Sequence, residues 1–132
     1  MSTMVLSARG ALLPSLGSLG IGLLIGAAGT AAHRAYQPWA VIGCLALVLA
    51  SAVLARAWGG MLALLAYGVG WVAVVQVLSL TGPGGDVLIP AGQVIGYGWL
   101  VGGMLAIAVA AFCPRRWFSD EVPAPTPALP GT

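Results

Sequence analysis

The chain has 132 residues, of which 60% are hydrophobic and 6% are charged, whereas soluble domains carry about 25% charged residues. This composition excludes an ordinary water-soluble fold, and the length indicates one domain. Five arginines against three acidic residues give a net charge of +2 without any basic cluster, which argues against nucleic acid as a partner.

Four long apolar runs indicate membrane spans. A helix of roughly 20 apolar residues, about 30 Å long, matches the hydrocarbon core of a bilayer. The runs are too long for barrel strands and do not alternate, so helices must satisfy the backbone in lipid. We therefore predict an all-α fold, a four-helix transmembrane bundle at 11–114. Its spans are expected at 11–32, 39–55, 61–80 and 94–113.

A short polar lead, 1–10, precedes the first span and carries Arg9. In the first span, Ser18, Gly22 and Gly26 stand at every fourth position, which predicts a close-packing helix face. A cleaved secretory signal peptide is the alternative, with Arg9 in its basic region. The apolar run exceeds the usual signal core of about 7–15 residues, and further spans follow, so the sequence favours a retained span.

Three polar segments separate the spans. The first begins at His33, which we expect at a wet helix end, and the second is a tight turn at 56–60. The third, 81–93, holds Asp86, the acidic residue that stands outside the C-terminal tail. After the fourth span Pro114 ends the helix, and the Pro-rich tail within 115–132 is predicted to be disordered and cytoplasmic.

The fourth span repeats the pattern of small residues, with Gly98 and Gly102 four positions apart and Gly103 beside them. Such spacing favours close helix contact in a membrane. We expect either that the first and fourth spans pack against each other or that one of their small-residue faces binds another protein.

The arginines predict the orientation. Four spans place the two termini and the middle turn on one side, where Arg9 and Arg56 are joined by Arg115 and Arg116. The opposite side has Arg34 alone. The positive-inside rule therefore predicts that both termini are cytoplasmic. Aromatic residues agree with this, at an inner interface (Trp58, Trp117, Phe118) and an outer one (Tyr36, Trp39, Tyr97, Trp99).

Polar residues gather at the outer ends of the predicted spans. We expect a polar cluster there, with Asp86 facing Arg34. The alternative is that these side chains form ordinary hydrogen bonds between helices and at the interface. The predicted cluster comprises Arg34, Gln76, Ser79, Asp86 and Tyr97.

The sequence lacks the patterns expected of an enzyme or a metal protein. It shows no nucleophile–base set and no phosphate loop, and a single histidine excludes a multi-histidine metal or haem site. Cys44 and Cys113 fall at opposite ends of their spans, beyond disulfide reach. We therefore predict no catalytic residue, no cofactor and no metal. Small multidrug exporters also have four spans, but the spans here lack the ionisable residue that proton coupling needs.

The segment around the fourth span resembles a family of small four-helix integral membrane proteins of actinobacteria, known as a domain of unknown function. The resemblance rests on Gly84-Gly85-Asp86, on Pro90 and on the run 96–103, GYGWLVGG, and it would cover about 12–114. It implies four spans and a membrane location. It implies no activity and no site residue.

The sequence thus predicts a multi-pass protein of the bacterial inner membrane without enzymatic activity. We expect an accessory or scaffold subunit, whose partners are the lipid bilayer and either another membrane protein or a second copy. The alternative is a small transporter or channel for a neutral or weakly polar solute, using the outer polar cluster.

Overall fold

Three helices make up most of the chain that the structure, a computed structural model, describes, namely residues 2–80, 94–117 and 131. They are α1 (Ser2–Ala32), α2 (Trp39–Leu80) and α3 (Val94–Phe112), and a short 3-10 turn, η1 (Arg115–Trp117), follows them. No strand occurs in these residues, which confirms the predicted all-α class.

The helix ends differ from the prediction at both ends of the chain. α1 begins at Ser2, so most of the lead is helical and Pro14 lies inside the helix instead of in its first turn. The lead contains good helix formers such as Met4, Leu6 and Ala8, which explains the extension. The start of the tail is ordered as η1, whereas 118–130 and the loop 81–93 lie outside the described residues.

α2 joins the second and third predicted spans through a break at two glycines. Gly59 (φ −132°, ψ 15°) and Gly60 (φ 70°, ψ −151°) have non-helical backbone angles inside this 42-residue element. The backbone of Gly60 falls in a region that is essentially reserved for glycine. We call 39–58 the first arm and 61–80 the second arm. The prediction of separate helices at 39–55 and 61–80 placed the end of the first arm too early.

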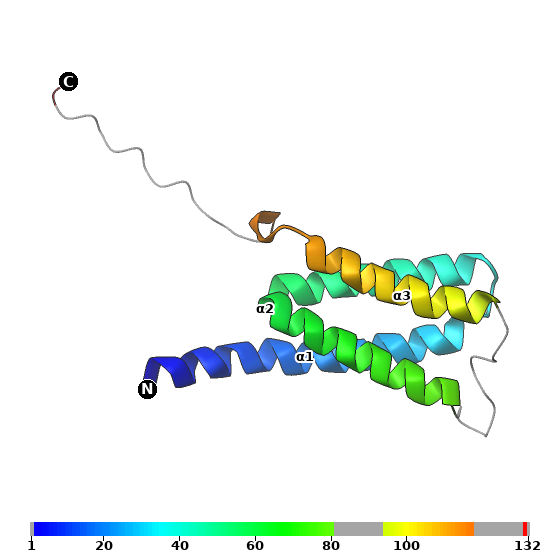
Figure 1. Ribbon diagram of the computed structural model, residues 1–132, viewed down its shortest axis with the longest axis horizontal. Coiled ribbons are helices and arrows are strands. Elements are labelled where there is room, and N and C mark those ends of the chain that lie inside the picture. Colours follow the sequence, from blue (N-terminus) through cyan, green and yellow to red (C-terminus); the bar gives the residue numbers. More distant parts are fainter. Residues whose placement is uncertain (1, 81–93, 118–130, 132) are drawn as a thin grey trace.

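The chain reverses direction at each connection. Figure 1 shows α1 running from the N-terminus to the far end of the body, the first arm returning, the second arm doubling back beside α1, and α3 returning again. The start of α1, the glycine break in α2 and the end of α3 therefore lie at one end of the molecule. The ends of α1 and of the second arm lie at the other, where α3 begins.

α1 packs its small-residue face closely on the second arm of α2. A Cβ at Gly22 would collide with the carbonyl oxygen of Tyr67, and one at Gly70 would lie 2.5 Å from the carbonyl oxygen of Leu19. The two glycines thus let the helix backbones touch, as small residues do in membrane helix pairs. Gly26 is equally close, because its Cβ would lie 2.5 Å from Val74. Ser18 on the same face is fully buried.

The partner of this face is α2 and not α3. Both α1 and α3 make most of their close backbone contacts with α2, whereas α1 and α3 meet mainly where the Trp99 ring lies over Gly29. The expected close pairing of the first and fourth spans is therefore replaced by a side-chain contact, because a large indole separates the two backbones at that level. The core lies between the arms of α2 and α3, with Tyr67, Trp71 and Trp99 fully buried.

α3 turns a stripe of small and aromatic residues toward α2. Gly96, Trp99, Gly103 and Ala110 are buried at spacings of three, four and seven residues, the period of one helix face. A Cβ at Gly102 would lie 2.9 Å from Leu45 of the first arm. Gly98 does not pack within the described part of the chain, since no atom lies within 4 Å of its Cβ position, so a packing role for it against another protein stays a prediction. Two residues from Gly96, it is turned by about 200°, onto the opposite face.

The glycine break predicts a strong effect of a single methyl group. Gly60→Ala should destabilise the protein by about 1–3 kcal/mol, because alanine is strained at the backbone angles of Gly60. Unfolding in mixed detergent micelles measures this change. Gly43→Ala is the matched control, since Gly43 lies in the helical first arm with no atom within 4 Å of its Cβ position. Equal stability of Gly60→Ala and the unaltered protein would contradict the importance of the break.

Candidate functional site

The predicted outer polar cluster does not form a hydrogen-bonded group among the described residues. Arg34, Gln76 and Tyr97 are exposed, and no ion pair or hydrogen bond joins them to one another within the described part of the chain. The Ser79 hydroxyl donates to the carbonyl of Val75 at 2.6 Å in its own helix. Asp86 lies outside the described residues. The four described members do share the end of the molecule where α3 begins.

A different polar group lies buried at this end of the molecule, where α1 meets α3. The Trp99 indole N–H donates to the Thr30 hydroxyl at 3.2 Å. His33 Nδ1 donates to the backbone carbonyl of Thr30 at 2.8 Å. The imidazole also stacks on the Trp99 indole, with ring centroids 5.7 Å apart and planes 13° apart. All three side chains have at most 1% of their surface exposed.

The expectation that His33 stands at a wet helix end was therefore wrong. The last four carbonyls of a helix lack partners within it, and the carbonyl of Thr30 is one of these in α1. The imidazole folds back to satisfy this carbonyl, which draws the ring under Trp99. Trp99 was likewise expected at the outer interface, and the same contacts bury it.

The aromatic cluster continues into α2 through Trp71, and glycines make room for both indoles. The Trp71 and Trp99 rings lie 5.5 Å apart at an angle of 58°, an arrangement typical of attractive aromatic pairs. A Cβ at Gly29 would collide with the Trp99 ring, and one at Gly103 with the Trp71 ring. We call Thr30, His33, Trp71 and Trp99 the aromatic cluster. It joins α1, α2 and α3 at a single point.

The side chains of the aromatic cluster are suited to holding the three helices together and not to catalysis. Among the described residues, His33 has no carboxylate or nucleophile as a hydrogen-bond partner, and neither its Nε2 nor the indole nitrogen of Trp71, both buried, has a partner there. The described residues contain no group of three side chains suited to a metal ion. The sequence signal that could have identified the cluster is a glycine on the helix that faces each tryptophan. Gly29 of α1 faces Trp99 of α3, and Gly103 of α3 faces Trp71 of α2.

A second polar contact joins the two arms of α2. The hydroxyl groups of Ser51 and Tyr67 lie 2.7 Å apart in a hydrogen bond between the arms. The Tyr67 side chain is fully buried, so its ring fills the space between the arms. The interior at this level is therefore occupied by side chains.

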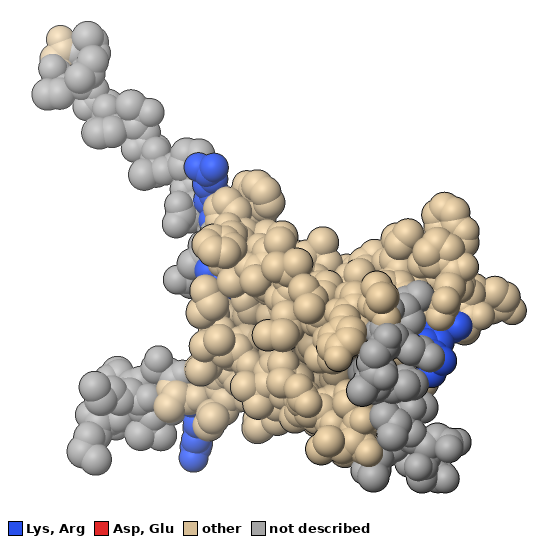
Figure 2. All heavy atoms as spheres, turned by 45° about the vertical axis from the view of Figure 1, so that its right-hand side comes forward, with Lys and Arg blue, Asp and Glu red and all other residues tan. Residues whose placement is uncertain are grey.

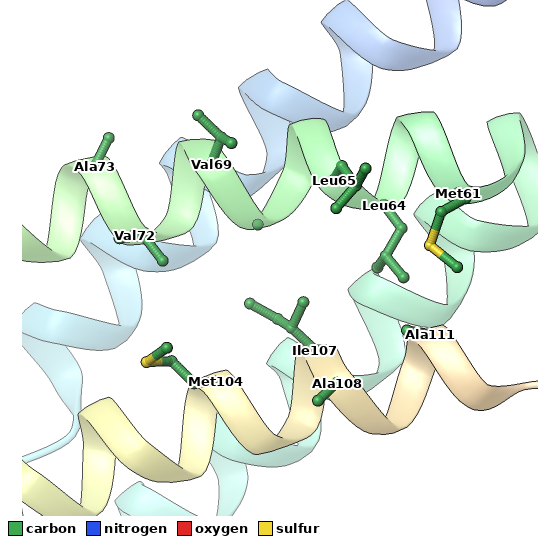
Figure 3. Close-up of a pocket in the computed structure, with 11 residues that line it drawn as sticks. Met61, Leu64, Leu65, Val69, Val72, Ala73, Met104, Ile107, Ala108 and Ala111 are labelled. Atoms are coloured by element: carbon green, nitrogen blue, oxygen red, sulfur yellow. The ribbon is translucent and has the colours of Figure 1, made fainter.

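An apolar groove opens on the side of the bundle. It has a volume of about 610 Å³ and lies between the second arm of α2 and α3. Met61, Leu64, Gly68 and Val72 line it from α2, and Met104, Ile107 and Ala111 line it from α3 (Figure 3). Every side chain that lines it is apolar, so it is suited to an apolar occupant.

The arginine side chains that the structure describes lie away from the middle of the body. Figure 2 shows arginine at the two ends and an uncharged surface between them on the face in view. Large apolar side chains are exposed on all three helices, among them Leu24, Leu62 and Leu105. Cys44 and Cys113 are free thiols, as predicted.

The comparisons with known proteins do not extend this description. Neither the family models nor the curated proteins nor the solved structures give a match to the chain. The resemblance to the actinobacterial membrane family consequently stays a prediction.

The hydrogen bond between Trp99 and Thr30 predicts measurable coupling between α1 and α3. Thr30→Val and Trp99→Phe should each destabilise the protein, and the double variant should lose less than the sum. The coupling free energy should be about 0.6 kcal/mol and at most about 1.7 kcal/mol, the range typical of hydrogen bonds between membrane helices. Unfolding in mixed micelles gives the four values of the cycle. Pairing Thr30→Val with Trp39→Phe is the control, because Trp39 is 74% exposed.

Proposed function

We propose that the chain is a multi-pass protein of the bacterial inner membrane that crosses the bilayer four times. Two described segments, Ala8–Ala32 and Trp39–Leu80, are long and apolar enough to cross a membrane. The second is about twice as long as one crossing needs, and each of its arms, at about 20 residues, matches a hydrocarbon core of about 30 Å. α3, with 19 residues, is almost as long.

The exposed side chains support this proposal. Leu13 and Leu24 on α1 are both 71% exposed, and Phe112 on α3 is 87% exposed. In water, so much contiguous apolar surface would drive association, whereas in a bilayer the acyl chains cover it. The resemblance to four-helix proteins of actinobacteria agrees with a membrane location.

α1 belongs to the proposed bundle as a retained span. Its contact with the second arm at Gly22 and Gly70, and the bond from Trp99 to Thr30, tie it to both other helices. Cleavage of α1 as a signal peptide would remove these contacts and expose Tyr67 and Trp71 on the side where α1 packs. The packing therefore favours the span over the signal peptide.

We infer an accessory or scaffold role, without enzymatic activity. The observation that carries this inference is the filled interior. Tyr67, Trp71 and Trp99 occupy it, and the groove opens sideways and is wholly apolar. A transporter or channel for a neutral or weakly polar solute needs an open path between the two sides, whereas a bundle with a filled interior and a lateral groove offers its surface to neighbours in the membrane.

The proposed topology predicts the outcome of reporter fusions. With four spans, both termini face the cytoplasm, in agreement with Arg9, Arg56 and Arg116 near one end and Arg34 near the other. A fluorescent protein fused after Thr132 should fluoresce, and alkaline phosphatase at the same place should be inactive. Phosphatase fused after Leu80 should be active and serves as the control. An active phosphatase fused after Thr132 would contradict the topology.

The scaffold role predicts a complex in the native membrane. Crosslinking of the full chain in intact membranes, followed by purification in mild detergent, should yield a membrane partner or a second copy at fixed stoichiometry. Reconstituted vesicles should show no more flux of small neutral solutes than protein-free vesicles. A lone monomer after crosslinking would contradict the role. A solute flux that Gln76→Leu reduces would favour the transporter instead.

A further inference from the structure

The groove between the second arm of α2 and α3 is short relative to a membrane span. Its lining on α2 extends from Met61 to Ala73, about 18 Å along a helix axis. One leaflet contributes about 15 Å of a hydrocarbon core about 30 Å thick. The groove therefore runs from one membrane surface to about the midplane. A transmembrane helix of a partner would need a groove about twice as long.

The chemistry and size of the groove fit an aliphatic chain. Its volume of about 610 Å³ lies within the range of about 300–1,000 Å³ for small-ligand sites. Gly68 and Ala108 keep its middle open, and Met61 and Met104 at its two ends are flexible side chains that adapt to an irregular ligand (Figure 3). No lining side chain donates or accepts a hydrogen bond, so the ligand must be apolar along this length.

The Arg56 guanidinium lies near Gly60, the residue before the first lining residue of the groove. Gly60 precedes Met61, and a Cβ at Gly60 would lie 3.9 Å from the Nη1 atom of Arg56. The guanidinium thus lies beside the glycine break, at the end of α2 from which the lining of the groove begins. Its Nε is buried and has no hydrogen-bond partner, and no ion pair involves Arg56 among the described residues. A cation at the mouth of an apolar groove complements a ligand with an anionic head and an aliphatic tail.

We propose that the groove holds one acyl chain of an anionic phospholipid, whose phosphate binds the Arg56 guanidinium. This proposal rests on the membrane location given above. The acyl chain lies along Gly68 and Ala108, and the head group lies at the membrane surface beside Gly60. The bound lipid covers the exposed faces of the second arm and α3 in that leaflet.

The test is native mass spectrometry of the full chain released from nanodiscs of equal parts phosphatidylglycerol and phosphatidylcholine. One phosphatidylglycerol should be retained per chain, with a preference of about fivefold for each cationic contact. Arg56→Gln should abolish the preference and Arg56→Lys should keep most of it. Arg9→Gln is the matched control, at the same end of the molecule but on α1, and should leave the preference unchanged.

A second pair of variants tests the groove. Gly68→Leu should abolish retention by filling the groove, and Ala108→Leu does the same from α3 should Gly68→Leu fail to fold. Gly20→Leu is the control, because no atom lies within 4 Å of its Cβ position. Unchanged retention in both groove variants, or equal retention of the two lipids by the unaltered chain, would overturn the proposal.

Two further outcomes separate this proposal from the one on which it rests. Extraction of the chain from native membranes by alkaline carbonate would overturn the membrane location and the lipid site together. An integral chain for which Gly68→Leu disrupts a dimer, with lipid retention intact, would overturn the lipid site alone and assign the groove to a second copy.

Discussion

The contact between α1 and the second arm of α2 is the constraint on which the remaining packing depends. Gly22 faces the backbone at Tyr67, and Gly70 faces the backbone at Leu19, so the two helices touch over more than one turn. Close approach on this side leaves no room for large side chains. The rings of Tyr67 and Trp71 therefore fill the space toward the first arm and α3, where they form the core.

The position of these rings determines how α3 packs against the other helices. The Trp71 ring needs space on α3, which Gly103 provides, and the Trp99 ring of α3 needs space on α1, which Gly29 provides. The bond from Trp99 to Thr30 then fixes the end of α1 relative to α3. Each indole thus lies against a glycine of the neighbouring helix, and the two indoles contact each other. The order of the helices follows from where these glycines stand.

The helical class, the approximate segments and the close-packing face of α1 were predictable because they depend on local patterns. The length of each apolar run indicates a helix, and the spacing of Gly22 and Gly26 indicates a helix face that other helices can approach closely. The pattern does not identify the partner of that face, which is why pairing with α3 was expected. It also does not show which glycines of a Gly-rich helix face inward, and Gly98 has no neighbour within the described chain.

The buried polar residues were less predictable, for a different reason. Position in the sequence indicates that His33 follows a helix, and residues at helix ends are usually wet. Whether such a side chain stays in water depends on an unpaired carbonyl nearby and on a ring that covers it, here Thr30 and Trp99. Both conditions depend on the tertiary structure, so the local sequence does not reveal them. The outer cluster was expected from shared depth alone, and shared depth does not bring Arg34, Gln76 and Tyr97 into contact.

The pairing of glycines with large side chains explains why the interior of the bundle is filled while its side has an open groove. Gly29, Gly102 and Gly103 each face a large side chain that occupies the space they leave, namely Trp99, Leu45 and Trp71. Gly68 has no such filler, because the nearest atom to its Cβ position is a methyl group of Ile107 at 3.6 Å. The groove persists at this point because neither α2 nor α3 supplies an aromatic residue to it. The space left unfilled in an otherwise filled bundle therefore opens on its side, at the groove between the second arm of α2 and α3.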